Sequence, residues 1–171
     1  QRQMCIRDRN TVYVKSIEDY RSAIPSWVGE EIPVPFHVAQ EVGRIRGEVE
    51  KLAQKGLGLK EVAEVVSQKY EASVKTVEKA ILSVYCMARE SVPVPTHRRI
   101  VVEDAEGIIV VHAHFGNRVN RVLGKYLSYR ISRLFGLPVY VSEKPYRILL
   151  RVEGVGMEEI EAILKLSLIH I

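Results

Sequence analysis

A strand that runs directly into a basic helix is the feature that most constrains the fold of this 171-residue chain. Residues 107–136 read GIIVVHAHFGNRVNRVLGKYLSYRISRLFG. The first six residues are mostly apolar and β-branched, which predicts a strand, and Phe115-Gly116-Asn117 predicts a turn. The remainder predicts a helix over 117–135, and at 100° per residue its side chains fall on two different faces.

The two faces of this expected helix differ in chemistry. The apolar stripe consists of Val119, Val122, Leu123, Tyr126, Leu127 and Leu134. The opposite face carries Arg118, Arg121 and Lys125. Free N–H groups at the start of a helix, together with arginines, could hold a phosphate. The alternative is an ordinary solvated basic face, which periodicity alone favours.

Composition sets wide limits on the function. The net charge is +4, from 25 basic and 21 acidic residues, which permits nucleic-acid binding without requiring it. No apolar run is long enough to span a membrane. Two cysteines, Cys5 and Cys86, are too few for a disulfide scaffold or a metal site, and this fits a reducing, cytoplasmic compartment.

Both ends of the chain look foreign to the rest. Residues 4–9 and 166–171 resemble translated sequencing-adapter sequence, so we expect segments 1–9 and 166–171 to be non-native and the domain to occupy 10–165. The chain would then be a fragment cut at both ends. Without segment 1–9 the net charge falls to +2, because three arginines and one aspartate leave with it.

The remaining segments predict an α+β fold. Residues 11–15 predict a strand, and three prolines between 24 and 35 exclude a helix there. Helical periodicity over 35–54 and 59–70, and a third helix after the N-cap Ser73, predict a three-helix insert at about 35–90. Strands at 99–103, 107–112, 137–142 and 146–152, with a last helix near 157, predict a sheet-plus-helix part at about 97–165. We therefore expect a mixed sheet with a hairpin and a long packed helix, plus the insert.

Several kinds of catalytic site are absent from the sequence. There is no GxxxxGK[ST] loop, so we expect no nucleotide cofactor in this chain, and no nucleophile has an obvious base. His112 and His114 alternate along a strand and share a face. A metal site would need further ligands, so a hydrogen-bonded pair lining the sheet is the favoured interpretation, and we predict neither a catalytic nor a metal-ligating residue.

Trp27 is the only tryptophan in the chain, and it lies in the proline-rich segment. A tryptophan buries a large area, so residue type alone favours a core position. The alternative is an exposed platform on which a nucleic-acid base stacks.

Two segments together resemble one protein family. Residues 26–35, SWVGEEIPVP, are similar to the Trp-x-Gly-Glu segment that follows the winged helix in Lhr-type helicases of superfamily two. Residues 112–120, HAHFGNRVN, resemble the H-x-x-F/L-G-x-x-V-N turn and helix start further on in the same region. The order and spacing also match, with a helical insert between them, and the resemblance covers about residues 10–165 and points to archaeal relatives.

The resemblance implies a role on nucleic acid. Lhr-type proteins are ATP-dependent helicases that move 3′ to 5′ on single-stranded DNA, and this chain would be the associated domain after two motor lobes and a winged helix. ATP and Mg²⁺ would bind the absent motor lobes. Trp27 would then stack on a base of the tracking strand, and Asn117, within the shared turn, is also expected to contact the nucleic acid. Arg118, Arg121 and Lys125 become expected phosphate contacts, whereas Arg130 on the apolar side is expected to form a buried ion pair.

Two other functions remain open. The chain could be a structural or protein-interaction module that packs on the motor lobes or a partner without touching nucleic acid. It could also be an independent metal-dependent hydrolase using His112 and His114, but the missing ligands argue against this. The sequence does not distinguish DNA from RNA as the preferred strand.

Overall fold

The computed structural model describes residues 2–8, 11–16, 32–105, 107–152, 154–155, 158–160 and 162–163. The chain divides into two units, residues 1–32 and 33–171, which we consider separately. Trp27 lies outside the described residues, so its expected stacking role stays a prediction. No helix in the described part of the chain is both long and apolar enough to cross a membrane.

The first unit contains a two-stranded antiparallel sheet. Strand β2 (Thr11–Ser16) confirms the predicted strand, and it pairs with β1 (Arg2–Asp8), with a register shift between Met4 and Ile6. The sequence of β1 gave no sign of regular structure. An unpaired strand presents a row of free N–H and C=O groups, and β1 and β2 satisfy those of each other.

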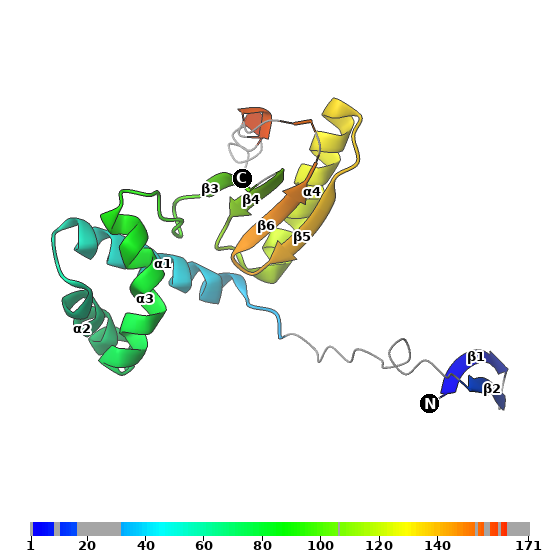
Figure 1. Cartoon of the computed structure of the whole chain (residues 1–171), viewed down its shortest axis with the longest axis horizontal. Coiled ribbons are helices and arrows are strands. Elements are labelled where there is room, and N and C mark those ends of the chain that lie inside the picture. The colour runs from blue at the N-terminus through cyan, green and yellow to red at the C-terminus, as the bar shows by residue number, and fades with distance from the viewer. Residues whose placement is uncertain are drawn as a thin grey trace. The chain divides into compact units, whose positions relative to one another are not determined.

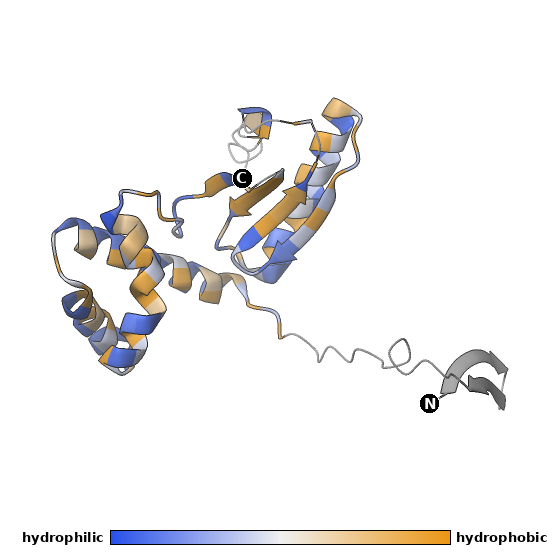
Figure 2. Ribbon diagram, viewed as in Figure 1, coloured by the Kyte–Doolittle hydropathy of each residue, from blue (hydrophilic) through white to orange (hydrophobic). Residues whose placement is uncertain are grey.

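The second unit begins with the three predicted helices, α1 (Phe36–Gln54), α2 (Leu59–Tyr70) and α3 (Val74–Arg89), which pack as a bundle (Figure 1). Each helix alternates hydrophobic and hydrophilic stripes (Figure 2), and the hydrophobic stripes form one core. Ser73 caps α3 as predicted, because its hydroxyl accepts a hydrogen bond from the Thr76 N–H at 3.2 Å. The core consists of Val49, Ala53, Val62, Ala63, Val66, Val77, Ile81, Val84, Ala88 and Val94.

A four-stranded sheet follows, with strand order β3-β4-β6-β5 and every pairing antiparallel. The strands are β3 (Val101–Ala105), β4 (Ile108–His112), β5 (Tyr140–Lys144) and β6 (Arg147–Arg151), so the predicted α+β class is confirmed. Strand β5 begins three residues later than predicted. Pro138, which has no N–H to donate to a neighbouring strand, lies just before its start.

Helix α4 (Gly116–Phe135) lies along one face of this sheet (Figure 1). We call the face under α4 the inner face and the opposite one the outer face. The second core lies between α4 and the inner face, and Ile160 and Ile163 of the predicted last helix also join it. It consists of Ile109, Val111, Ala113, Leu123, Leu127, Ile131, Ile148, Leu150, Val152, Ile160 and Ile163.

The predicted apolar stripe of α4 is wrong in most positions. Leu123 and Leu127 are buried as predicted, but Val119, Val122, Tyr126 and Leu134 are exposed. The buried face of α4 is instead formed by Gly116, Asn120, Leu123, Gly124, Leu127 and Ile131.

Close packing explains which side of α4 turns inward. A Cβ atom on Gly124 would lie 3.0 Å from Cγ1 of Val141 and 3.2 Å from Cγ2 of Ile148, so the missing side chain lets the helix approach the sheet. Asn120 is fully buried, and its Nδ2 donates hydrogen bonds that replace those of water. An apolar count overlooks both residues, since neither is hydrophobic.

The start of α4 also contacts the chain that leads into α1. Gly116 has φ +78°, and a Cβ atom there would lie 2.5 Å from the carbonyl oxygen of Val34. The rings of Phe36 and Phe115 stack with centroids 6.1 Å apart. These contacts connect the helical bundle to the sheet at the beginning of α4.

We expect Gly116→Ala to destabilise the second unit well beyond the cost of its backbone conformation. Gly56 has a similar φ of +91° but no atom within 4 Å of its Cβ position, so Gly56→Ala is the matched control. A left-handed conformation costs a non-glycine residue about 1–2 kcal/mol, and this cost is common to both variants. Chemical unfolding should show an additional loss of stability for Gly116→Ala, and equal losses would contradict the close approach to Val34.

Candidate nucleic-acid interface

Asn120 joins three parts of the second unit at one end of the sheet. Its Nδ2 donates to the carbonyl oxygens of Ala113 at 2.9 Å, Lys144 at 2.8 Å and Pro145 at 3.1 Å. The N–H of Gly116 also donates to the Pro145 carbonyl at 2.9 Å. The first turn of α4, the end of β4 and the β5–β6 turn therefore occupy fixed positions next to one another.

Asn117 attaches a further segment to the same end. Its side-chain Oδ1 accepts a hydrogen bond from the N–H of Val34 at 2.8 Å, and its own N–H donates to the carbonyl of Val34 at 3.1 Å. Asn117 was predicted to contact nucleic acid. The structure gives its amide oxygen a structural partner, which leaves the amide nitrogen as the group that could meet a ligand.

The predicted phosphate contacts lie on the surface of α4. Arg118, Arg121 and Lys125 are exposed, and none forms an ion pair with any residue that the structure describes. The whole of α4 contains five basic residues and no acidic one. Its surface is therefore positively charged, with no counter-charge on the helix itself.

The expected buried ion pair of Arg130 is not formed among the described residues. Arg130 is half-buried, and its Nε has no hydrogen-bond partner. No acidic residue is available on α4 itself to pair with it.

Apolar side chains are exposed between the basic residues of α4. The exposed fraction is 70% for Val122, 56% for Tyr129 and 58% for Leu134. Exposed apolar residues on one helix often mark a contact with another molecule or domain.

Sequence reasoning missed the outer face of the sheet. Ile148 and Leu150 of β6 belong to the inner core, so Arg147 and Arg151 point to the outer face together with their neighbours Lys144 and Tyr140 on β5. The alternation of side chains along β6 could have indicated this face, because the strand reads Arg-Ile-Leu-Leu-Arg, with a basic residue at each end.

The outer face has a cavity of about 480 Å³ at the end near the β5–β6 turn. Its lining includes Arg46 of α1, His112 at the end of β4, and Lys144 and Arg147 on either side of the turn. At the other end of β5 and β6, a cavity of about 260 Å³ is lined by Tyr140, which is 72% exposed, and Arg151. The outer face therefore combines basic and aromatic side chains.

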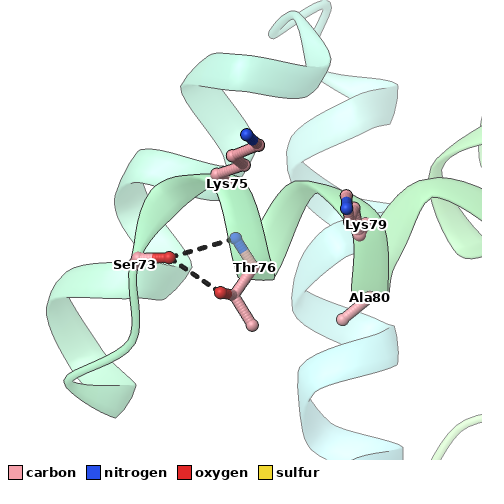
Figure 3. A pocket seen from close by; sticks show the side chains of 5 residues that line it. All are labelled: Ser73, Lys75, Thr76, Lys79 and Ala80. Carbon is pink, nitrogen blue, oxygen red and sulfur yellow. Dashed lines mark hydrogen bonds between the residues drawn. The ribbon is translucent and has the colours of Figure 1, made fainter.

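A third cavity lies on the helical bundle, at the start of α3 (Figure 3). Ser73 and Thr76 bond to each other there, and Lys75 and Lys79 are exposed beside them. The hydroxyl of Ser73 already accepts a hydrogen bond from the N–H of Thr76 at the start of α3. The charged groups that this cavity offers to a ligand are therefore two solvated lysines.

The two histidines singled out in the sequence lie in different surroundings. His112 is half-buried and its Nε2 lies 3.0 Å from Oε1 of Glu103, whereas His114 is 3% exposed and its ring contacts that of Tyr146. No group of three or more His, Cys, Asp or Glu side chains suited to a metal occurs in the part of the chain that the structure describes. Both histidines line the cavity of about 480 Å³, so they share a face as predicted. His112 pairs with Glu103, whereas Nδ1 of His114 has no hydrogen-bond partner.

Burial lowers the pKa of His114 from 6.5 to about 4, and the nearby charges of Arg46 and His112 act in the same direction. A folded-state pKa below the unfolded value means that the unfolded chain binds the proton more readily. The neutral histidine therefore contributes stability above about pH 6.5, and this contribution is lost as the pH falls toward 4.

We accordingly expect the chain to lose stability between pH 7 and pH 5, with His114 responsible for part of the loss. Thermal unfolding of His114→Gln should depend less on pH over this range, even if the variant is less stable at pH 7. His37 is exposed, so His37→Gln is the control and should keep the dependence of the unaltered chain. An identical pH dependence for His114→Gln and the unaltered chain would show that His114 is not the group that titrates.

Comparison with known proteins assigns this chain to a family. The DEAD/H associated family matches residues 94–169, which include the sheet and α4. The ATP-dependent helicase Lhr-Core of Saccharolobus solfataricus is 30% identical over 141 residues, covering 77% of this chain and 16% of that protein. Lhr-Core of Methanothermobacter thermautotrophicus is 30% identical over 139 residues, with the same coverage.

A further relative covers more of the chain. ATP-dependent helicase Lhr-Core protein 2 of Thermococcus barophilus is 25% identical over 165 residues, which are 92% of this chain and 18% of that protein. The chain thus spans about one sixth of the length of the curated relatives it matches. No solved structure matches it. The chain belongs to the Lhr-type helicases, of which it represents the accessory segment that contains the DEAD/H-associated domain.

Proposed function

We propose that this chain is the nucleic-acid-binding accessory domain of an ATP-dependent 3′-to-5′ DNA helicase, and that it contacts the tracking single strand by base stacking and phosphate contacts. The motor lobes of the same protein would bind and hydrolyse ATP with Mg²⁺, and a winged helix would lie between them and this domain. Both belong to the part of the relatives that this chain does not span.

The observation that carries the proposal is the unpaired positive charge of α4. Arg118, Arg121 and Lys125 are exposed on a helix that has no acidic residue. Contacts from such side chains to phosphates hold a strand in place without reading its sequence, which is what a translocating enzyme requires.

The position of α4 supports the same function. The N-terminal part of α4 meets the β5–β6 turn through Asn120 and the segment before α1 through Asn117. Trp27 belongs to the proline-rich segment that leads into Val34, and its proposed role is to stack on a base. Stacking of one base on an aromatic side chain contributes about 1–3 kcal/mol and tolerates any sequence.

Binding of a fluorescent oligothymidine to the 171-residue chain over a salt series tests the proposal. We expect Trp27→Ala to weaken binding about 5- to 160-fold, the range that corresponds to loss of one stacked base. Substitution of Arg118, Arg121 and Lys125 by Gln should weaken binding and also reduce the salt dependence. The slope of log K against log salt should fall by about 0.7 for each phosphate that the variant no longer neutralises.

The matched control replaces Lys60, Lys75 and Lys79 by Gln, because these exposed lysines of the helical bundle carry the same total charge. Equal effects of the two triple variants would contradict specific contacts by α4. Circular dichroism must show that Trp27→Ala is folded. If it is not, Trp27→Phe keeps an aromatic ring and should retain most of the binding.

The exposed apolar residues of α4 favour a second candidate function, in which α4 packs on another domain and does not touch nucleic acid. Val122→Ser distinguishes the two, because Val122 neighbours Arg121 on the surface but carries no charge. The first function expects oligothymidine binding by Val122→Ser to stay within about twofold of the unaltered chain. Absence of binding by the unaltered chain at low salt would leave the packing function as the better account.

A further inference from the structure

The cavity of about 480 Å³ on the outer face is built from parts of the chain that are far apart in sequence. Arg46 comes from α1, His112 and His114 from the end of β4, and Lys144, Tyr146 and Arg147 from the β5–β6 turn. None of the residues that line this cavity is acidic. The hydrogen bonds of Asn120 to Lys144 and to Pro145 hold the turn in place.

Three of these side chains form a row across the sheet, and two of them, Lys144 and Arg147, are permanent cations. The strand register places Lys144 directly opposite Arg147, and Arg147 directly opposite His112. Residues directly opposite one another in an antiparallel sheet project on the same face, and like charges in such pairs are destabilising. A protein that keeps two permanent cations in this arrangement gains stability when an anion lies between them.

Arg46 brings a further positive charge from the other side of the cavity. Its Nε donates to the carbonyl of Pro95 at 2.9 Å, which fixes the plane of the guanidinium group. Burial lowers the pKa of Arg46, although an arginine remains charged at neutral pH. No carboxylate within the described ranges pairs with Arg46, Lys144 or Arg147.

The neighbouring titratable groups do not supply the missing negative charge. Glu103 is engaged by His112 at 3.0 Å, and Glu143 approaches Gly124 of α4 and so belongs to the inner face. His114 is neutral at pH 7, and its buried Nδ1 has no hydrogen-bond partner. The cavity is therefore lined by cations that no carboxylate of the described residues pairs with.

We propose that this cavity binds one phosphate group of the nucleic-acid backbone, held by Arg46, Lys144 and Arg147. The proposal rests on the proposed function, because it names a second contact of the same bound strand. A guanidinium group can bind two oxygens of one phosphate at once, and a lysine ammonium supplies a mobile charge beside it. The same set of donors would also hold free inorganic phosphate, so the source of the phosphate has to be tested.

The test compares two double variants of the 171-residue chain that remove the same charge. In Lys144→Gln with Arg147→Gln, both altered residues are exposed and neither side chain makes a hydrogen bond or ion pair within the described residues. In the control, Lys75→Gln with Lys79→Gln, the altered lysines line the third cavity (Figure 3). Oligothymidine binding is measured over a salt series, and amide NMR shifts of Tyr146 and Arg147 are followed while inorganic phosphate is added.

We expect the Lys144 and Arg147 variant to bind oligothymidine at least tenfold more weakly than the control variant, with a salt slope smaller by about 0.7 because one phosphate is no longer neutralised. Equal oligothymidine binding by the two double variants overturns the proposed phosphate site in the cavity. If the unaltered chain nevertheless binds oligothymidine, the proposed function of the chain stands. If the unaltered chain binds no oligothymidine, the proposed function fails. Shifts of Tyr146 and Arg147 with inorganic phosphate would then assign the cavity to free phosphate and overturn the nucleic-acid source.

Discussion

The second unit depends on one buried amide group. Asn120 is fully buried, and its Nδ2 donates to carbonyl oxygens at the end of β4 and in the β5–β6 turn. The hydrogen bond to the Ala113 carbonyl is buried, and a buried polar group left without a partner costs about 1–3 kcal/mol. The amide therefore fixes the position of α4 on the sheet, and with it the two basic surfaces proposed to meet nucleic acid.

Glycine residues allow the helices to come close enough for these contacts. Gly124 lets α4 approach Val141, Gly116 lets the start of α4 approach Val34, and Gly43 lets α1 approach the backbone of His97, whose N would lie 2.5 Å from a Cβ atom on Gly43. The last two contacts connect the helical bundle to the sheet. Arg46 follows Gly43 by less than one helical turn, so the approach of α1 also places Arg46 at the cavity.

Most of the elements could be predicted from the sequence, because local signals define them. Ser73 caps α3, Gly56 lies just after α1 with a φ of +91°, and Gly107, with a φ of +85°, lies between the paired strands β3 and β4. The orientation of α4 could not be predicted by counting apolar residues. The buried face of α4 is determined by Gly124, which has no side chain, and by Asn120, whose hydrogen-bond partners lie on distant segments.

The same limit applies to the candidate site. The basic face of α4 was visible in the sequence because Arg118, Arg121 and Lys125 are close together along one helix. The cavity could not be predicted from the sequence, because Arg46 and Arg147 are about a hundred residues apart and come together only after folding. Strand alternation in β6 indicated which face Arg147 occupies, but only the pairing of β5, β6 and β4 shows that the charges form a row.

Hydrogen–deuterium exchange of the 171-residue chain, with and without a saturating oligothymidine, is the most direct test of the proposed interface. A bound strand should slow amide exchange in the first two turns of α4 and in the β5–β6 turn, because both present unpaired cations at the same end of the sheet. Exchange around Lys75 and Lys79 at the start of α3 should stay unchanged. Protection confined to the helical bundle, with none in α4 or the β5–β6 turn, would contradict the assignment of the nucleic-acid interface.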